Sequence, residues 1–421
     1  MMKIKVLLMG AVLITALFAS CEKANVDVDT TPIPVNTSGI SGEVYGIWTK
    51  GSVIRVTGDI IVPVDKSLTI EEGVLVIMDT LARPEFIVKG NLYSRGTVEN
   101  PVKITIEENY RNEAHKLGKM WGGILGAPTC KELLLDHTIL EYGGSTVTEA
   151  SMSLKLGLYK AAAGENLPAL WFSNVKGKLV VNGSTIRHFQ EDCTYIEGGQ
   201  IIFTGNRFYA TGLTGGEGIN IKSGCIADVS YNLFYSNNTN ALKLSNAGDR
   251  VPQAHVIAFN NTMLNTGWRR PTAKGGSVWV EASVFVEMYN NLFANTRFGI
   301  KRDVKKLEDA RSKFRNSLYY GETQTIVNQF QPTAEIVGGV NDVISATVKA
   351  NDPLFVNYPL STSTDNVTFN EGWDFHLQAG SAALNKGTKD FVRNFPNGIT
   401  INGELYSSPE PSSYIGAYGA K

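Results

Sequence analysis

The stretch SYNLFYSN, at residues 230–237, has the pattern that decides the fold: a strand-like run, an Asn, any residue and a large apolar residue. The same pattern recurs as TGNRFYATG (204–212), FNNTMLNTG (259–267), YNNLFANT (289–296) and FRNSLYYG (314–321). The Asn positions are Asn206, Asn232, Asn261, Asn291 and Asn316, and the apolar positions are Phe208, Phe234, Met263, Phe293 and Leu318. HTIL (137–140) and STIR (184–187) place Ile139 and Ile186 at the apolar position, with His137 and Ser184 in place of Asn. Such recurrence is typical of repeat architectures.

The length of the repeat indicates which architecture this is. The anchors recur every 22 to 30 residues, the length of one turn of a parallel β-helix. Asn tolerates the left-handed backbone of a sharp turn, and its amide can bond to an Asn one coil above. Between anchors, GINI (218–221), ALKL (241–244) and SVWV (277–280) alternate like strands, and no helical period suggests crossover helices. We therefore predict an all-β solenoid of about a dozen coils with Asn-rich turns.

Both ends of the chain carry a family resemblance. GSVIRVTGDIIVPVDKSLTIEEGVLVIMD (51–79), PEFIVKGNLYSRGTVENPVKITI (84–106) and WGGI (121–124) resemble the first coils of right-handed parallel β-helix proteins of Bacteroidetes-type surfaces. DPLFVNYP (352–359), DFHLQAGSAALNKGT (374–388) and IGAYG (415–419) resemble the closing segment of pectin-lyase-like β-helices. The resemblance implies a right-handed parallel β-helix over 42–348 and a closing segment over 349–421. It implies no single function, because this fold carries many.

The N-terminus predicts export. Lys3 and Lys5 precede the apolar run 6–19, which has the length of a signal segment and is short for a membrane span. FASC, ending at Cys21, resembles a bacterial lipobox, which implies a signal peptide at 1–20, a lipid on Cys21 and a flexible tether over 21–41. The alternative is a plain secretory signal. With Glu22 after the Cys, the resemblance implies attachment to the outer membrane or cell surface of a Gram-negative bacterium.

The composition of the chain limits the classes of partner that it can bind. The formal net charge is −1, so no strong field attracts nucleic acid, and we expect none as a partner. Beyond Cys21, three cysteines remain, and this odd number argues against a disulfide framework. We expect at least one buried thiol that packs as a small apolar residue, and a monomeric chain.

The alternating runs also predict a binding face. If Ile219, Leu242 and Val278 point inward, then Asn220, Lys243 and Trp279 form an outward column. The same alternation in ALWF (169–172) puts Trp171 outside, and Lys301 extends the column. An exposed Trp can cover a sugar ring while Lys and Asn bond its hydroxyls or carboxylates. The alternative is that the tryptophans are covered by the inserted segments 145–168 and 303–314, of which the second is charged and has the composition of a helix.

GWRRPTAKGG (267–276) offers a catalytic alternative. It resembles the R-x-P-x-x-R-x-G stretch of pectate lyases, which implies Arg269 as general base and Lys274 as its partner. Asp136 and His137 resemble a second short stretch of those enzymes, and only this lyase hypothesis implies calcium. Lys in place of the second Arg weakens it, and we found no acidic cluster in the coils around 206–300, so we expected no metal site. We favour a turn in which Arg269 and Arg270 assist binding beside Trp279.

Other chemistry has less support. The N-T-D and D-D pairs that hydrolases of this fold use do not occur, and neither do metal-ligand spacings nor a nucleophile motif. The preferred interpretation is a lipid-anchored surface protein that binds glycan or makes adhesive contacts along one sheet face, without a cofactor. The alternatives are a polysaccharide lyase or glycoside hydrolase, and a structural spike.

Overall fold

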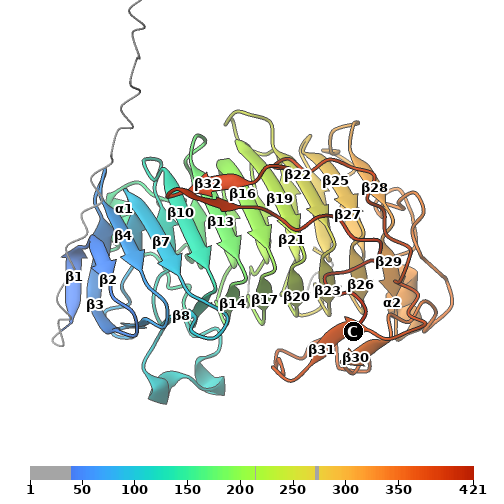
Figure 1. The fold of residues 1–421 in the computed structure, drawn as a ribbon, viewed down its shortest axis with the longest axis horizontal. Helices are drawn as coiled ribbons and strands as arrows, with labels where there is room; N and C mark the ends of the chain where they lie inside the picture. Colours follow the sequence, from blue (N-terminus) through green and yellow to red (C-terminus); the bar gives the residue numbers. More distant parts are fainter. Residues whose placement is uncertain (1–38, 214, 271–274) are drawn as a thin grey trace, which may run out of the picture.

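Three parallel β-ladders wind into one solenoid in the computed structural model, which describes residues 39–213, 215–270 and 275–421 (Figure 1). Sheet A has ten strands, so the right-handed β-helix has about ten coils, slightly fewer than the dozen expected. The other two ladders, here called ladder B and ladder C, join into one 19-stranded sheet. They meet in the long strand β3, which pairs with β5 through Val53–Val56 and with β6 through Ile60–Val62. The all-β prediction is confirmed.

Each complete coil contributes one strand to each ladder in the order A, B, C. Sheet A contains β2 (Gly46–Trp48), β4 (Ser67–Ile70), β7 (Asn91–Arg95), β10 (Glu132–Asp136), β13 (Lys178–Asn182), β16 (Gly199–Thr204), β19 (Cys225–Ser230), β22 (His255–Phe259), β25 (Phe285–Tyr289) and β28 (Lys313–Arg315). Ladder B contains β3 (Val53–Val62), β5 (Leu75–Met78), β8 (Val102–Thr105), β11 (Thr138–Glu141), β14 (Thr185–Arg187), β17 (Arg207–Tyr209), β20 (Leu233–Tyr235), β23 (Thr262–Leu264), β26 (Leu292–Ala294) and β29 (Leu318–Tyr320). Ladder C shares β3 and adds β6 (Phe86–Val88), β9 (Ile124–Gly126), β12 (Leu170–Phe172), β15 (Thr194–Ile196), β18 (Ile219–Ile221), β21 (Leu242–Ser245), β24 (Val278–Glu281) and β27 (Ile300–Arg302).

The remaining elements lie at the ends or in loops. Strand β1 (Ile40–Glu43) pairs with β3, and α1 (Met152–Lys155) is a single turn in the inserted segment. Helix α2 (Gln324–Gln329) follows the last coil. Two short hairpins, β30 (Phe355–Asn357) with β31 (Asp374–Leu377) and β32 (Ile399–Ile401) with β33 (Glu404–Tyr406), complete the chain with the 3-10 turns Glu108–Tyr110 and Glu113–His115. The segment 303–312 contains no helix, contrary to the expectation from its composition.

The Asn ladder forms at the turn from sheet A to ladder B. The side-chain amide of Asn206 donates to the Oδ1 of Asn232 at 2.9 Å, Asn232 to Asn261 at 3.0 Å, and Asn261 to Asn291 at 2.9 Å. All four side chains are buried, so each amide group replaces water that the turn has lost. The left-handed backbone falls on the residue before the ladder Asn, as at Tyr231, Asn260 and Asn290, and not on the ladder Asn itself.

Two anchors were predicted one residue off. Strand pairing aligns Asn291 with Ser317 and Phe293 with Tyr319, so Asn316 and Leu318 are not the fifth members of their columns. At the other end Leu140 pairs with Ile186, which puts Thr138, and not His137, at the ladder position. Asn316 and His137 both have positive φ, of 54° and 44°. They occupy the left-handed turn position, one residue before the ladder position. Both positions favour the same residue types, which is why the repeats were aligned one residue off.

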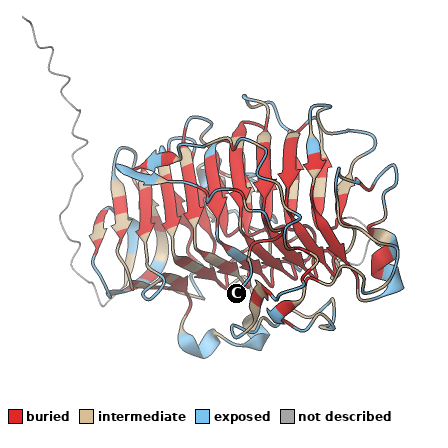
Figure 2. Cartoon of the chain, turned by 45° about the vertical axis from the view of Figure 1, so that its right-hand side comes forward, coloured by how far each residue is buried: buried red, intermediate tan, exposed pale blue. Residues whose placement is uncertain are grey.

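The interior of the solenoid is filled by inward side chains stacked coil on coil. Phe208 and Phe234 stack with ring centroids 5.1 Å apart, and Phe293 and Tyr319 with centroids 4.8 Å apart. Cys130, Cys193 and Cys225 are free and buried, which confirms the expected apolar role of the thiols. Figure 2 shows this buried band running along the strands, with exposed residues gathered in the loops.

The C-terminal segment runs back along the outside of the solenoid (Figure 1). On ladder B, Phe369 and Trp373 pack against Tyr235, with ring centroids 5.6 Å and 5.3 Å away. On sheet A, Ile399 and Ile401 join a buried cluster with four outward residues, Tyr93, Leu134, Val180 and Ile202. The closing segment therefore covers the outer faces of two ladders and leaves much of ladder C open.

Candidate functional site

The predicted outward column lies on ladder C. Strand register places Trp171, Tyr195, Asn220, Lys243, Trp279 and Lys301 one above another. Their neighbours in each strand, among them Ile219, Leu242 and Val278, are fully buried in the core. The alternation argument therefore gave the right stacking. Neither the strands nor their register test which of these residues bind a ligand.

The column divides into a covered part and an open part. Trp171 was expected outside, but it is only 2% exposed, because the insertion after β11 packs over it through Val147, Leu158 and Leu167. The ring of Tyr159 closes this contact, lying edge-on to both Trp171 and Tyr195. For Trp171 the covering alternative is thus correct. In the rest of the column Tyr195, Lys243, Trp279 and Lys301 are partly exposed, while Asn220 is buried.

Three adjoining cavities follow the open part, and we call them together the ladder C groove. The first, about 430 Å³, is lined by residues including Tyr195, Asn220 and Lys243. The second, about 260 Å³, shares Lys243 and Arg270 with it and adds Trp279. The third, about 310 Å³, shares Trp279 and adds Lys301. At the usual spacing between strands, β15 to β27 span about 20 Å, which gives the groove the shape for an extended ligand.

A cluster of three carboxylates lies at the end of the groove next to the insertion. Glu191, Asp192 and Glu217 each offer an oxygen, and these atoms all lie within 4.8 Å of one another. Asp192 accepts hydrogen bonds from the backbone N–H groups of Gly216 and Glu217, at 3.0 Å and 2.9 Å, and from Asn220 Nδ2 at 2.9 Å. The search for acids in the coils around 206–300 missed this cluster, because of its three acids only Glu217 lies in that range.

The wall around the cluster fixes the two glutamates. Asn166 of the insertion donates to Glu191 at 3.4 Å, and Lys243 lies 3.8 Å from a carboxylate oxygen of Glu217. A Cβ on Gly215 would lie only 1.5 Å from Oε1 of Glu191, so a glycine at this position is needed for the cluster to assemble.

Burial and mutual repulsion shift the pKa values of the three carboxyl groups. Burial, reinforced by the charge of Glu217, raises the pKa of both Glu191 and Asp192. Burial also opposes ionisation of Glu217, but a hydrogen bond with Asp192 and the charge of Lys243 prevail and lower the pKa of Glu217. Nearby, burial and the charge of Lys243 lower the pKa of Lys222. Burial and the neighbouring charges thus shift the pKa values of adjacent carboxyl groups in opposite directions, a pattern common at functional sites.

Strand register explains why the repeats did not predict the carboxylate cluster. Thr194, Ile219 and Leu242 pair across ladder C, so the residues two positions earlier, Asp192, Glu217 and Asn240, are also equivalent. These residues lie in turns, which have no alternation to mark them. Asp192 and Glu217 each lie three residues before a column position, Tyr195 and Asn220, so moving back by three residues aligns both acids.

The described residues of the stretch GWRRPTAKGG, 267–270 and 275–276, lie between β23 and β24. Arg269 donates to the carbonyl oxygens of Thr211, Gly212 and Ser236, at 2.5 Å, 2.7 Å and 2.7 Å. Burial lowers the pKa of Arg269 to about 10, which leaves it charged at neutral pH. Arg270 lines two cavities of the groove, while Lys274 lies outside the described residues. The hydrogen-bond geometry thus gives Arg269 a structural task, holding three turns together.

Asp136 and His137 lie at a different turn. Asp136 is the last residue of β10 and His137 follows it, between sheet A and ladder B, whereas the groove is lined by the turns that lead into ladder C. His137 Nδ1 and Asp136 Oδ1 are 2.7 Å apart, and Asn182 donates to the same oxygen at 2.8 Å. The structure therefore does not bring this pair together with Arg269 or with the carboxylate cluster.

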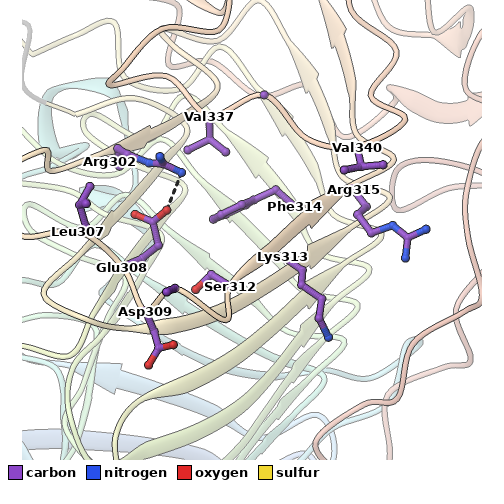
Figure 3. Close-up of a pocket in the computed structure, with 12 residues that line it drawn as sticks. Arg302, Leu307, Glu308, Asp309, Ser312, Lys313, Phe314, Arg315, Val337 and Val340 are labelled. Carbon is purple, nitrogen blue, oxygen red and sulfur yellow. Dashed lines mark ion pairs between the residues drawn. The ribbon is translucent and has the colours of Figure 1, made fainter.

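A separate cavity of about 540 Å³ lies at the last coil (Figure 3). Phe314 crosses it. Arg302 and Glu308 pair with each other at 2.6 Å on one side, and Lys313 and Arg315 point away from the cavity. This cavity is therefore a space between β28 and the chain that follows, and its charged side chains do not converge as those of the groove do.

Comparison with known proteins agrees with the fold. Residues 169–333 match the family model described as "Right handed beta helix region". Neither the curated proteins nor the solved structures give a significant match. In the part of the chain that the structure describes, none of the helices has the length and apolar character needed to span a bilayer. The chain is a right-handed parallel β-helix protein whose solenoid carries an open polar groove on ladder C.

Proposed function

We propose that the protein binds an extended glycan along the ladder C groove. The observation that carries this proposal is the register of Asn220, Lys243, Trp279 and Lys301 beside three cavities that share their lining residues. Trp279 lines two of these cavities, and its Nε1 is fixed by Glu281 at 2.9 Å. A ring held in place loses little entropy when a sugar packs on it.

Charge along the groove supports a polar polymer rather than an apolar ligand. Four basic and four acidic side chains line the first cavity. The basic ones are Lys160, Lys222, Lys243 and Arg270, and the acidic ones are Glu165, Glu191, Asp192 and Glu217. Donors and acceptors are thus interleaved, which suits the hydroxyl groups of a sugar. The buried Trp171 and the insertion close the groove at one end, so the ligand extends from Tyr195 toward Lys301.

The second candidate function is glycoside hydrolysis at the carboxylate cluster. It is favoured by the opposite pKa shifts of Glu191 and Glu217, since hydrolysis needs one protonated and one ionised carboxyl group. Glu191 would donate its proton to the glycosidic oxygen as the C–O bond breaks, while the carboxylate of Glu217 attacks the anomeric carbon to form a glycosyl ester. Water would then hydrolyse this ester and return a proton to Glu191. The 4.8 Å limit on their oxygen separation is closer to the roughly 5 Å of retaining enzymes than to the wider spacing of inverting ones. A uronate lyase centred on Arg269 has less support, because its guanidinium is engaged by carbonyl groups.

The setting of this activity is proposed from the sequence. Residues 1–38 lie outside the described part, and within them Cys21 is the proposed lipid attachment site. A tether after Cys21 would hold the solenoid, as a monomer, away from the outer membrane of a Gram-negative cell. Labelling with a radioactive fatty acid, with Cys21→Ser as control, tests the anchor. A structural spike remains the third possibility and requires no ligand.

The test of glycan binding uses residues 22–421 and a panel of neutral and uronate-containing polysaccharides. We expect quenching of tryptophan fluorescence by at least one member of the panel, with affinity about tenfold weaker in Trp279→Ala. The matched control is Tyr110→Ala, because Tyr110 is an exposed aromatic residue on a loop that does not line the groove. No binding to any polysaccharide, or equal loss in both variants, would reject the proposal.

The same panel separates binding from catalysis. Hydrolysis releases reducing ends, and a lyase releases an unsaturated product that absorbs in the ultraviolet. Release of reducing ends that disappears in Glu191→Gln would establish the second candidate. Absorbance that disappears in Arg269→Ala would instead support the lyase hypothesis. Binding without either product leaves the groove as a recognition site.

A further inference from the structure

The carboxylate cluster has few close positive charges among the described residues, although four basic side chains line its cavity. Three acidic side chains meet at one place, and Asp192 and Glu217 are only 4% and 6% exposed. Among the described side chains, the ion pair at the cluster is that of Lys243 with Glu217, at the long distance of 3.8 Å. Lys160 is bound to Glu165, and Lys222 lies over the ring of Tyr195 at 5.5 Å. Buried carboxylates without a close positive charge are stable only when they are protonated or bind a cation.

A second observation at the same place points to a cation. Asn220 is 3% exposed and lines the cavity of the cluster, and its Oδ1 finds no hydrogen-bond partner among the described residues. Its Nδ2 donates to Asp192, so the side-chain amide is held against the cluster with its oxygen free. An unpaired buried carbonyl oxygen costs stability unless something occupies it. A hard cation takes an amide oxygen of this kind as a ligand, and a proton shared among the carboxyl groups is the alternative that the test below separates.

We propose that Glu191, Asp192, Glu217 and Asn220 form a calcium-binding site at the closed end of the ladder C groove. Calcium takes oxygen ligands at 2.3–2.6 Å, so two of its ligands can be about 5 Å apart at most. The 4.8 Å limit on the carboxylate oxygens meets this condition as the chain stands. Magnesium, at about 2.0–2.1 Å, would require the oxygens to move closer together.

The chain also supplies the support that such a site needs. The two backbone N–H groups of Gly216 and Glu217 orient Asp192, and Asn166 orients Glu191. Four protein ligands leave calcium short of its usual six to eight, so the remaining positions face the cavity. Water or oxygens of a ligand in the groove would fill them. The cation site itself does not depend on the glycan proposal, but it excludes proton donation by Glu191 while calcium is bound.

The test measures cation binding with no glycan present. Protein stripped with a chelator is titrated with CaCl₂ by calorimetry and with TbCl₃ by luminescence, excited through Tyr159 and Tyr195, which line the same cavity. We expect saturable binding of one ion, with Mg²⁺ competing weakly. Glu191→Gln and Glu217→Gln should each weaken it by more than about tenfold. Glu165→Gln, in the wall of the same cavity, should stay within about twofold of the parent.

Thermal unfolding guards against misfolded variants. Glu191→Gln removes one of three carboxylates that repel one another, so its Tm without calcium should be higher than that of the parent, while the rise in Tm on adding calcium should disappear. Absence of saturable binding in the parent, or equal weakening in Glu165→Gln, overturns the proposal and leaves a proton-sharing cluster. Because no polysaccharide enters the assay, a failed glycan screen cannot mimic either result.

Discussion

Ladders B and C present opposite surfaces on one solenoid. The outer positions of ladder B carry Tyr209, Leu233, Tyr235, Leu264 and Leu292, all buried, and the C-terminal segment lies on them. The outer positions of ladder C carry Asn220, Lys243, Trp279 and Lys301, and three cavities lie beside them. A strand that is apolar on both sides must be covered, whereas one that alternates can face water or a ligand. The chain covers its apolar outer faces itself and leaves the polar one free.

The first way to break this comparison is Tyr235→Ala on the covered face. Tyr235 is fully buried among Tyr358, Phe369 and Trp373, and loss of a buried aromatic side chain usually costs about 3–5 kcal/mol. Trp279→Ala, on the open face, should change the free energy of unfolding by less than about 1 kcal/mol. Urea unfolding followed by circular dichroism measures both. Similar losses in the two variants would mean that the faces do not differ as described.

Arg269→Ala tests whether the basic turn beside the groove is structural. The change leaves the carbonyl groups of Thr211, Gly212 and Ser236 without their charged donor, and we expect a loss of about 2–3 kcal/mol. Arg269→Lys should recover only part of it, because an ammonium group cannot reproduce the planar fork of the guanidinium. If the urea midpoint of Arg269→Ala equals that of the parent, Arg269 has no structural role, and the earlier hypothesis that it assists ligand binding would be favoured instead.

The covered face of sheet A also predicts a pH effect. Burial raises the pKa of Asp228 to about 6, although its carboxylate accepts from the backbone N–H groups of Asn394 and Phe395. Since the folded pKa exceeds the unfolded value, the stabilising contribution of Asp228 is complete below about pH 4 and is lost as the pH rises through 6. The slope is at most about 1.4 kcal/mol per pH unit.

Asp228→Asn isolates this contribution. The variant cannot ionise, so its stability should fall less steeply than that of the parent between pH 4 and pH 6. Thermal unfolding at several pH values gives the difference between the two slopes, which removes the effect of the other titrating groups. Parallel curves would show that the closing segment does not hold Asp228 in an apolar environment.

The smallest expected effect is that of Lys301→Ala at the far end of the open face. Lys301 lies 4.3 Å from the ring centroid of Phe298 and 3.3 Å from Glu335, and its side chain is largely buried. We expect a loss of about 0.5–1 kcal/mol in glycan affinity, because a charge that is partly engaged by the protein contributes little to the ligand. A loss larger than that of Trp279→Ala would shift the centre of the groove toward the last coils.

The sequence predicted what repeats and missed what does not. The Asn ladder and the column from Asn220 to Lys301 depend on periodic positions, so alignment of the repeats placed them. The insertion over Trp171 and the acids of the cluster lie in loops between strands, where length and composition carry no register. A signal for the covered face was present but unused: the runs LFY (233–235) and LYY (318–320) are apolar on both sides, which is typical of strands that are covered.

Hydrogen–deuterium exchange with the tightest-binding polysaccharide of the panel tests the central claim most directly. The ladder C groove predicts protection in the turns and strands at 190–196, 215–222, 240–245, 278–281 and 299–303, with no change in 355–377 on ladder B. Protection on ladder B or sheet A, or none anywhere at a saturating concentration of polysaccharide, would contradict it.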